Sequence, residues 1–551
     1  MTVLQGHGIS QGAVHGPIYF FRRSPKPAES ARLGCDPESE HKRLAHARAA
    51  AAQELLELAG AAETEAGENG AALFEAHAML LEDEDAVSAA DTLISQGHSA
   101  EYAVAQAARA AENLLIDTGR PDLYARTADV EDVAERLQRL LSGGQESLLS
   151  FPHPVILCAE DLSPSETIHL DKTKILAIAT QRGSATSHTA ILARTLGIPA
   201  VCGLGDELNE SLHGQEAILS GDTGQLILNP DPSAMQALDS NLARQTSHQA
   251  QCQAMIGLDD CTSDGRPMPI CCNIASPADV SAVLANDGHG IGLFRSEFLY
   301  LAAGDYPSEE VQFRAYRQVA EAMESKRVVI RTMDIGADKQ IGYFQFRPEA
   351  NPALGLRAIR LCLARPQMFR TQLRALYRAS AYGNIAILFP MIASVWEIQA
   401  CRKICRQVMD ELTEQGIPFH ANTQLGVMIE TPAAVMMAPE LAEEADFFSV
   451  GTNDLTQYTL ACDRQCAGLE PYYNPRHPAV LRQLKLAADA AHQAGIPIGI
   501  CGELAADADL LPTFLALGID ELSVAPASVL PLRAALRGID STACDLRLLM
   551  G

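Results

Sequence analysis

The feature that most constrains the fold is a series of eight short apolar segments in the C-terminal part of the chain, separated by stretches with a helical pattern. Apolar runs that alternate with helices predict parallel strands, and eight such units predict a closed (β/α)8 barrel, or TIM barrel, over residues 261–551. The expected strands are Pro269–Cys272, Gly290–Phe294, Val328–Thr332, Ala386–Pro390, Leu425–Ile429, Phe447–Val450, Pro497–Ile500 and Glu521–Val524.

Polar residues stand at the C-terminal ends of five of these expected strands. Parallel strands of a barrel end at one mouth, and active sites of TIM barrels lie there. Random placement of charged residues in loops explains one or two such positions, but hardly five. The sequence therefore predicts an active site at this mouth. The residues in question are Arg295, Arg331, Glu430, the pair Asn453–Asp454, and Cys501.

The chain before the barrel shows two further patterns. Residues 38–141 are rich in Ala and have helical spacing of apolar residues, with no strand signal, so they predict a helical bundle. A strand-like segment near the N-terminus and short apolar runs over residues 151–230 predict an α/β domain. We expect this domain to comprise residues 1–30 and 145–230, with a helical domain inserted at 31–144 and a linker helix at 231–260.

A loop of small residues at Gly183–Ser187 leads into an apolar segment that predicts a helix, with His188 at its first turn. Thr186 or Ser187 can cap this helix. The N-terminal end of a helix attracts anions such as phosphate, and a neutral imidazole is a suitable nucleophile toward phosphorus. From the residues alone, a purely structural histidine at a helix start remains the alternative.

Composition limits the kinds of partner. The 551 residues carry a formal net charge of −27, which argues against binding to nucleic acid or anionic membranes and permits a basic protein partner. No signal-peptide pattern or apolar run long enough to cross a bilayer is present. The fourteen cysteines have no disulfide-framework spacing, so we expect reduced thiols and a cytoplasmic protein that is not inserted in a membrane.

The stretch Gly183–Arg194 resembles the phosphohistidine loop of enzymes that take phosphate from phosphoenolpyruvate (PEP), namely Enzyme I of the sugar phosphotransferase system, PEP synthase and pyruvate phosphate dikinase. Their pattern is Gly-Gly-x-x-Ser-His-x-Ala, usually after Thr-Asp-x. Gln181 stands here in place of the usual Asp, and Ser184 in place of the second Gly. The resemblance implies that His188 is the residue that is phosphorylated.

The barrel motifs resemble those of Enzyme I closely, and the resemblance extends over essentially the whole chain. It implies a PEP-protein phosphotransferase that passes phosphate from PEP to His188 and then to a histidine of a small phosphocarrier protein, HPr, releasing pyruvate. It also implies a His domain that swivels between two sites, and a homodimer formed through the barrel. The matching motifs are Gly292–Phe298, Arg331–Asp334, Asn351–Arg360, Glu430–Ala433, Gly451–Tyr458 and Cys501–Ala505.

The residue types fit this chemistry, because PEP carries a phosphate and a carboxylate and therefore needs several cations. Glu430 and Asp454 are hard oxygen ligands suited to Mg²⁺, and the family uses the cysteine that matches Cys501 as general acid. A network of structural salt bridges is the alternative. The expected PEP-binding residues are Arg295, Arg331, Lys339, Arg357, Asn453, Asp454 and Arg464.

Residues 73–85 resemble the helical segment with which Enzyme I docks HPr. Acidic and apolar side chains mixed on one helix would complement a basic, partly apolar partner, whereas a solvated acidic helix face is the plainer interpretation. The candidate partner-binding residues are Phe74, Glu75, His77, Met79, Leu80, Glu82, Asp83 and Glu84.

Two other functions remain open at this point. One is a regulatory paralogue that binds PEP without turnover, which the substitutions at Gln181 and Ser184 would suit. The other is an enzyme that uses ATP or a small acceptor. The lack of a Gly-rich phosphate loop in the helical segment argues against the latter.

Overall fold

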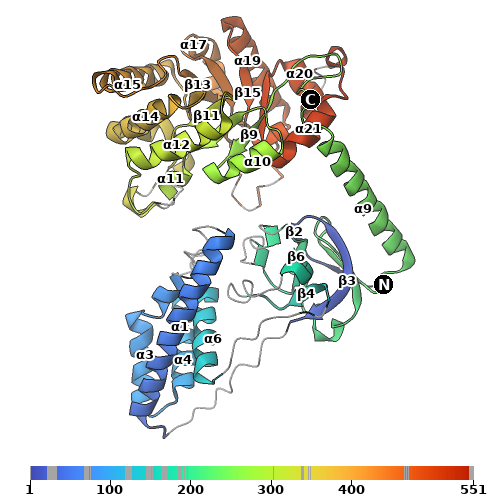
Figure 1. The fold of residues 1–551 in the computed structure, drawn as a ribbon, viewed down its shortest axis with the longest axis vertical. Coiled ribbons are helices and arrows are strands. Elements are labelled where there is room, and N and C mark those ends of the chain that lie inside the picture. Colours follow the sequence, from blue (N-terminus) through green and yellow to red (C-terminus); the bar gives the residue numbers. More distant parts are fainter. Residues whose placement is uncertain are drawn as a thin grey trace. The chain divides into compact units, whose positions relative to one another are not determined.

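The computed structural model forms two compact units, residues 1–245 and 246–551, which are described separately (Figure 1). The ranges that the structure describes are 2–21, 34–66, 74, 76–117, 127–143, 151, 153–162, 172–183, 189–190, 193–194, 197–301, 303–336, 341–344, 346–347, 349–464, 466, 468–469, 471–544 and 546.

The second unit is a closed barrel of eight parallel strands, which confirms the predicted TIM barrel. Each strand pairs with the next along the chain, and the last pairs with the first, as in Val524 opposite Cys272. The strands are β9 (Ile270–Ile274), β10 (Ile291–Arg295), β11 (Val328–Arg331), β12 (Ile385–Phe389), β13 (Gln424–Ile429), β14 (Phe447–Val450), β15 (Ile498–Ile500) and β16 (Glu521–Val524).

The strands are apolar almost throughout because both of their faces are covered. Every residue of β12 is buried, for example. Side chains that point into the barrel form a packed layer there, and the opposite side chains pack against the surrounding helices. The inward layer consists of Leu293, Val329, Ala386, Leu388, Met428, Phe447 and Cys501.

Helices between the strands cover the outside of the barrel (Figure 1). Their apolar residues recur at helical spacing, as for Phe369, Leu373 and Leu376 of α14, which are all fully buried. Their starts carry capping residues, as at α15, where Ser394 and Glu397 form a capping box. The main helices are α10 (Val280–Ala285), α12 (Glu309–Met323), α13 (Ala358–Ala364), α14 (Pro366–Ser380), α15 (Val395–Glu414), α16 (Pro432–Met436), α17 (Ala438–Ala442), α18 (Thr452–Leu460), α19 (Pro478–Ala494), α20 (Leu511–Leu517) and α21 (Val529–Leu536).

The first unit contains a mixed eight-stranded sheet in the order β1-β8-β7-β3-β4-β5-β6-β2. Strand β3 joins its two halves, since it pairs antiparallel with β7 and parallel with β4. The outermost strands β1 and β2 were not expected, because they are short, largely exposed and lack an apolar run. The strands are β1 (Thr2–Gln5), β2 (His7–Ser10), β3 (Ala13–Phe20), β4 (Val155–Ala159), β5 (Ile175–Thr180), β6 (Ala200–Cys202), β7 (Glu216–Ser220) and β8 (Gln225–Leu228).

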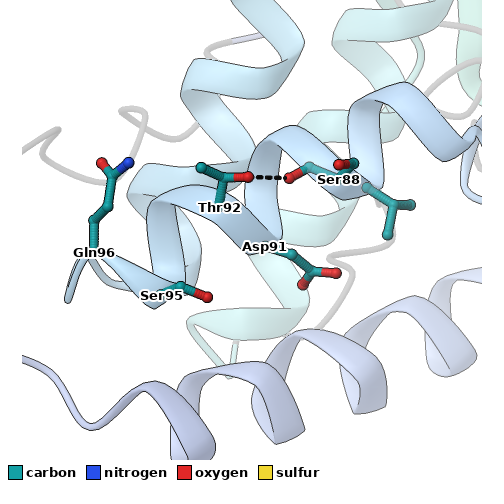
Figure 2. Close-up of a pocket in the computed structure, with 6 residues that line it drawn as sticks. Ser88, Asp91, Thr92, Ser95 and Gln96 are labelled. Atoms are coloured by element: carbon teal, nitrogen blue, oxygen red, sulfur yellow. Dashed lines mark hydrogen bonds between the residues drawn. The ribbon is translucent and has the colours of Figure 1, made fainter.

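A helical bundle lies between β3 and β4 in the chain. It consists of α1 (Pro37–Ala66), α3 (Glu84–Ser95), α4 (Ala100–Asp117) and α6 (Thr127–Leu141). Ala51, Leu55 and Ile94 are fully buried in its core. Figure 2 shows a polar surface hollow along α3, where Thr92 Oγ1 donates to the backbone oxygen of Ser88 at 2.8 Å.

The long helix α9 (Pro232–Gln253) spans the boundary between the two units, and its surface is largely polar and exposed. Of the helices in the described ranges, none combines the length and apolar character that a membrane crossing would need.

Candidate functional site

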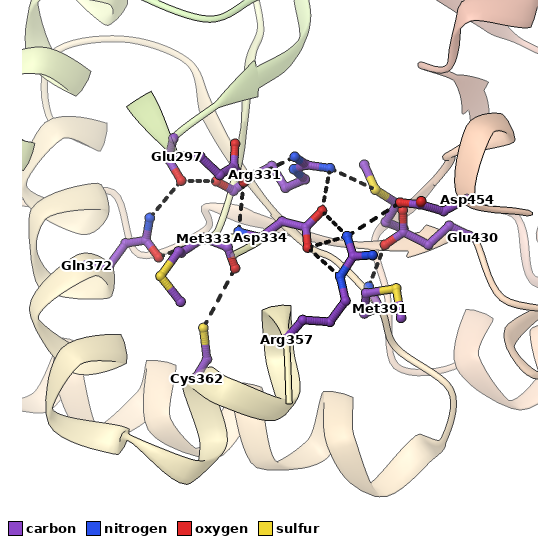
Figure 3. Close-up of polar contacts among 12 residues, drawn as sticks. Glu297, Arg331, Met333, Asp334, Arg357, Cys362, Gln372, Met391, Glu430 and Asp454 are labelled. Carbon is purple, nitrogen blue, oxygen red and sulfur yellow. Dashed lines mark hydrogen bonds and ion pairs between the residues drawn. The ribbon is translucent and has the colours of Figure 1, made fainter. Parts of the chain in front are cut away.

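The barrel brings several of the expected residues together just beyond its strand ends (Figure 3). Arg331 is the last residue of β11, Glu430 directly follows β13, and Asp454 lies in the first turn of α18 after β14. Arg357 immediately precedes α13. Because these positions lie at one end of a parallel barrel, side chains from distant parts of the chain meet in one cluster.

Asp334 connects the two buried arginines of this cluster. Its Oδ1 and Oδ2 accept from Nη2 of Arg357 at 2.8 and 3.0 Å, and Oδ1 also accepts from Nε at 3.2 Å. Its Oδ2 lies 3.1 Å from Nη1 of Arg331. A carboxylate held by two guanidiniums at these distances fixes their separation and orientation.

Glu297 supports the same arrangement from the segment after β10. Its Oε1 accepts from Nη2 of Arg331 at 3.1 Å and from the backbone N–H of Asp334 at 2.7 Å. Tyr458 supports Arg357 from the other side, because its hydroxyl accepts from Nη1 at 3.2 Å. Sequence analysis did not identify Glu297, Asp334 or Tyr458 as site residues, although all three stand inside the motifs that carry the resemblance.

Both arginines remain charged in this environment. Burial alone would lower the pKa of Arg331, but nearby Glu297 and Asp334 outweigh burial and raise it above its usual value. For Arg357, Asp334 and Asp454 likewise outweigh burial and raise its pKa. Within the described part of the chain, the buried Nε of Arg331 has no hydrogen-bond partner. This donor is therefore available to an anionic ligand.

Glu430 and Asp454 form a pair of carboxylates with side chains that are almost fully enclosed, at 1% and 8% exposure. Glu430 Oε1 accepts from the backbone N–H of Met391 at 2.6 Å. Burial raises the pKa of Glu430 well above its usual value, and the charges of Asp454 and Asp334 raise it further. Two carboxylates that share one buried site are stable there only when one of them is protonated or when a cation neutralises their charge.

This donor set fits Mg²⁺. Four carboxylates and two guanidiniums share the cluster in Figure 3, so a divalent cation would balance the excess negative charge. Carboxylate oxygens are the ligands that Mg²⁺ prefers, and Mg²⁺ commonly uses only one or two of them together with substrate phosphate oxygens.

Three further expected ligands lie at the rim. Arg295 ends β10 and is exposed, and Arg464 is exposed in the segment after α18. Asn453 is held by a reciprocal pair of hydrogen bonds with Glu503, since Nδ2 donates to Oε1 at 3.0 Å and the Glu503 N–H donates to Oδ1 at 3.1 Å. Lys339 lies outside the described residues.

Cys501 directly follows β15 and points into the barrel, with 3% exposure. Its thiol donates to the backbone oxygen of Val450 at 3.5 Å. Burial raises the pKa of this thiol to about 11, although a hydrogen bond with the Ser449 side chain opposes the shift. The charges of Glu430 and Arg331 act on the thiol, so it belongs to the same electrostatic environment. A protonated thiol in this place can supply a proton at neutral pH.

The expected nucleophile His188 lies outside the described residues, but its surroundings are partly described. Gly183, which opens the loop, has a φ of 104°, a conformation that favours glycine. The Gln181 side chain donates to the backbone oxygen of Leu208. Thr189, which follows the histidine, is buried, and its hydroxyl donates to the backbone oxygen of Leu162 at 3.4 Å.

The structure corrects part of the expected docking segment. Phe74 and His77 are buried in the helical bundle, at 2% and 0% exposure, so they cannot face a partner there. His77 lies between two carboxylates of α6, with Nε2 3.2 Å from Asp129 and Nδ1 3.4 Å from Asp132. The resemblance of residues 73–85 to a docking helix suggested both residues, but their apolar and ion-paired contacts turn them inward.

The remaining residues of this segment differ in exposure and role. Met79 is 72% exposed, Leu80 is half-buried and Glu82 is exposed. Asp83 caps α3, because its Oδ1 accepts from the backbone N–H of Ala86 at 2.9 Å. Glu84 is the first residue of α3, and Glu75 lies outside the described residues.

Three family models match successive parts of the chain. They are the N-terminal part of PEP-utilising enzymes at residues 5–126, the mobile domain at 151–224 and the PEP-binding domain at 249–541. The PEP-binding domain model covers the barrel and every described residue of the cluster. The fold and the site therefore define a PEP-utilising enzyme.

Proteins named phosphoenolpyruvate-protein phosphotransferase are similar over nearly the whole chain. That of Geobacillus stearothermophilus is 41% identical over 96% of this chain and 92% of its own length. That of Bacillus subtilis is 37% identical over 97% of this chain and 94% of its own length. That of Lactococcus lactis subsp. lactis is 40% identical over 98% of this chain and 95% of its own length. The chain belongs to the phosphoenolpyruvate-protein phosphotransferase family, also known as Enzyme I. An NMR structure of an Enzyme I protein matches 44% of the chain at 28% identity, with a TM-score of 0.38.

Proposed function

We propose that the protein is a PEP-protein phosphotransferase that transfers phosphate from PEP to His188 and then to a histidine of an HPr-type carrier protein. Pyruvate is released, and the reaction is the first step of sugar uptake by the phosphotransferase system. The observation that supports this most directly is the cluster of Arg331, Arg357, Glu430 and Asp454 with the buried thiol of Cys501 at one barrel mouth.

Each group in the cluster has a role in this reaction. The guanidiniums bind the phosphate and carboxylate of PEP, and the free Nε of Arg331 is one donor available for that purpose. Arg295, Arg464 and Asn453 complete the binding at the rim, and Lys339 is a further candidate cation for PEP. After phosphate leaves, the Cys501 thiol delivers a proton to the terminal carbon of enolpyruvate.

Glu430 and Asp454 would hold Mg²⁺, which neutralises charge on the phosphate and carboxylate oxygens when it is bound. Both carboxylates are almost fully enclosed, which limits the access of water to them. Arg357, 3.7 Å from Asp454, orients that carboxylate at the same time as it binds the substrate.

His188 belongs to the first unit and the PEP site to the second, and we propose that the α/β domain swivels to carry phosphate between the PEP site and the carrier protein. The acceptor docks on the helical bundle, where Met79, Leu80 and Glu82 offer apolar and acidic groups to a basic partner. We further propose that the protein is cytoplasmic, in keeping with cysteines that show no disulfide-framework spacing in the sequence, and that it forms a homodimer through its barrel.

Labelling with PEP carrying ³²P tests the proposal. In the presence of Mg²⁺ the protein should acquire acid-labile label, and a mixture with candidate carriers should show which carrier becomes labelled. If PEP leaves the protein unlabelled while PEP still binds, the protein is the non-catalytic paralogue. If labelling requires ATP in place of PEP, the enzyme uses a nucleotide.

A further inference from the structure

A small cavity lies inside the barrel, near the N-terminal ends of its strands. Its volume is about 20 Å³. Its walls come from β10, β11, β14, β15 and β16 and from the residues just before β11 and β15. The residues that matter for its chemistry are Arg327, Ser449 and Glu521.

Two glycines leave this space open. An added Cβ at Gly499 would lie 3.2 Å from the Cβ of Glu521, and one at Gly292 would lie 2.5 Å from Oγ of Ser523. Side chains at these two positions would therefore crowd their neighbours and occupy part of the interior space that now forms the cavity. A site of this volume accommodates one water molecule, provided that polar partners surround it.

The cavity has such partners. Nε and Nη2 of Arg327 are buried, and no hydrogen-bond acceptor for them is found among the described residues. Nη1 of Arg327 lies 3.6 Å from Oε2 of Glu521, and the ring of Phe447 covers the guanidinium with its centroid 4.2 Å away. Two buried donor atoms without a partner are costly, and a water molecule in the adjoining cavity would remove this cost.

The cavity is linked to the proposed proton donor through Ser449. Ser449, which lines it, forms a side-chain hydrogen bond with the thiol of Cys501. At the other end, the side chains of Arg327 and Glu521 are 25% and 23% exposed, so they reach solvent at the N-terminal end of the barrel. Burial raises the pKa of Glu521. A raised pKa lies closer to neutral pH, so this carboxyl group is better suited to exchange protons with water.

We propose that this cavity binds one water molecule that carries protons between solvent near Glu521 and the thiol of Cys501 through the hydroxyl of Ser449. The inference rests on the proposed function. When the thiol gives its proton to the terminal carbon of enolpyruvate, a C–H bond forms and a thiolate remains. Ser449 O–H protonates the thiolate, the cavity water restores the Ser449 proton, and Glu521 or solvent restores the water. One proton passes from solvent to carbon in each cycle.

The route matters because the mouth of the barrel holds the substrate during this step. Cys501 is 3% exposed, and a bound ligand between the arginines and the thiol would separate it further from bulk water at the mouth. A thiolate of a thiol with pKa about 11 is a strong base in water, so it takes a proton readily from a connected donor.

The test uses the full chain and two measurements. The first is single-turnover phosphorylation by ³²P-labelled PEP with Mg²⁺, which reports the proposed function. The second is deuterium incorporation into the methyl group of pyruvate in D₂O with Mg²⁺, followed by NMR, which reports proton exchange through Cys501. The variants are Ser449→Ala, which breaks the connection, Gly499→Ala, which fills the cavity, and Glu521→Gln.

Ser449→Ala and Gly499→Ala should slow methyl exchange by roughly a hundredfold, the lower end for loss of a positioned proton-transfer group, while single-turnover phosphorylation stays within about threefold. Glu521→Gln should slow exchange less, since water can still reach the cavity. Ser380→Ala is the matched control. Ser380 is also buried at the C-terminal end of α14, and its hydroxyl donates to the backbone oxygen of Tyr377 at 2.6 Å.

Methyl exchange at the wild-type rate in both Ser449→Ala and Gly499→Ala would overturn the relay. So would a high-resolution crystal structure of the wild type that shows no water within hydrogen-bond distance of Arg327. A wild-type protein that PEP fails to label would instead reject the proposed function on which the relay rests.

Discussion

Asp334 binds Arg357 through both of its carboxylate oxygens, at 2.8 and 3.0 Å, and Arg331 lies 3.1 Å from the same carboxylate. The three side chains are nearly enclosed, with Asp334 4% exposed. The two guanidiniums are therefore set at a fixed separation before any ligand arrives. Such an arrangement lowers the entropy lost when a doubly anionic ligand binds.

Asp334→Asn should weaken PEP binding strongly. The amide keeps the volume but removes the charge that holds two buried guanidiniums, so both arginines lose their alignment. We expect KM for PEP to rise by roughly tenfold to a hundredfold, which corresponds to about 1.5–3 kcal/mol, with a smaller change in kcat. Steady-state kinetics at saturating Mg²⁺ measures both constants.

Asp260→Asn provides the matched control. Asp260 and Arg533 are both about 3% exposed, and they form a buried ion pair at 2.6 Å outside the cluster, before β9. This variant should lose stability to a comparable extent while KM for PEP stays unchanged. Equal rises of KM in the two variants would show that Asp334 only supports the fold.

Replacement of Glu430 or Asp454 by Ala should abolish transfer from PEP. Each change removes one of the two carboxylates that fit the metal, and without the metal the charge of the transferring phosphate is not neutralised. Back-transfer from a phosphorylated carrier to His188 should continue, because that step uses only the first unit. Loss of both directions in a folded variant would contradict the assignment of two separate sites.

His188→Ala should remain unlabelled by ³²P-labelled PEP while it still binds PEP and Mg²⁺. The imidazole is the proposed phosphorus acceptor, and the barrel site does not depend on it. Calorimetric titration with PEP and Mg²⁺ is the control for an intact site. Acid-labile label on this variant would move the assignment to another histidine.

The barrel could be predicted from the sequence because each of its strands is a continuous apolar run between helices. The polar residues at the strand ends could be listed for the same reason. Asp334 and Glu297 were missed, since a sequence shows which charges lie near the mouth but not which charge binds which arginine. The edge strands β1 and β2 were missed because their residues are largely exposed and their pairing depends on β8 and β6, which lie far along the chain.

Burial also explains why the docking segment was only partly predicted from the sequence. Phe74 and His77 lie in the same segment as the exposed Met79, and the sequence does not tell which face of this segment the bundle covers. The ion pairs of His77 with Asp129 and Asp132 depend on the packing of α6 against the segment. A contact between residues some fifty positions apart has no local signal in the chain.

His77 should make the stability of the helical bundle depend on pH. Burial alone would lower its pKa, but hydrogen bonds to Asp129 and Asp132 outweigh burial and raise the pKa to about 9. The folded pKa is higher than the unfolded value of about 6.5, so protonated His77 stabilises the fold fully below pH 6.5. This contribution, at most about 3 kcal/mol, is lost as pH rises through 9.

Urea unfolding of the wild type and of His77→Gln between pH 6 and pH 10 measures this effect. The stability difference between the two proteins should be largest at pH 6 and should shrink toward pH 10. A difference that stays constant over this range would show that His77 is neutral in the folded protein and acts through packing alone.

Cys501→Ser should separate phosphoryl transfer from pyruvate formation. The hydroxyl keeps the shape of the side chain, but its proton is held far more tightly than that of a thiol with pKa about 11. The variant should still bind PEP and should phosphorylate His188 slowly, while turnover to pyruvate falls by roughly a hundredfold or more. Pyruvate formed from stereospecifically deuterated PEP in tritiated water should also lose its facial selectivity, because the proton then arrives from water on either face. The raised pKa adds a further expectation for the wild type. Cys501 stays protonated up to about pH 10, so pyruvate formation should show no decline from loss of this proton below that pH. Stereospecifically labelled pyruvate made by Cys501→Ser at the wild-type rate would show that another group, such as Glu503, is the acid.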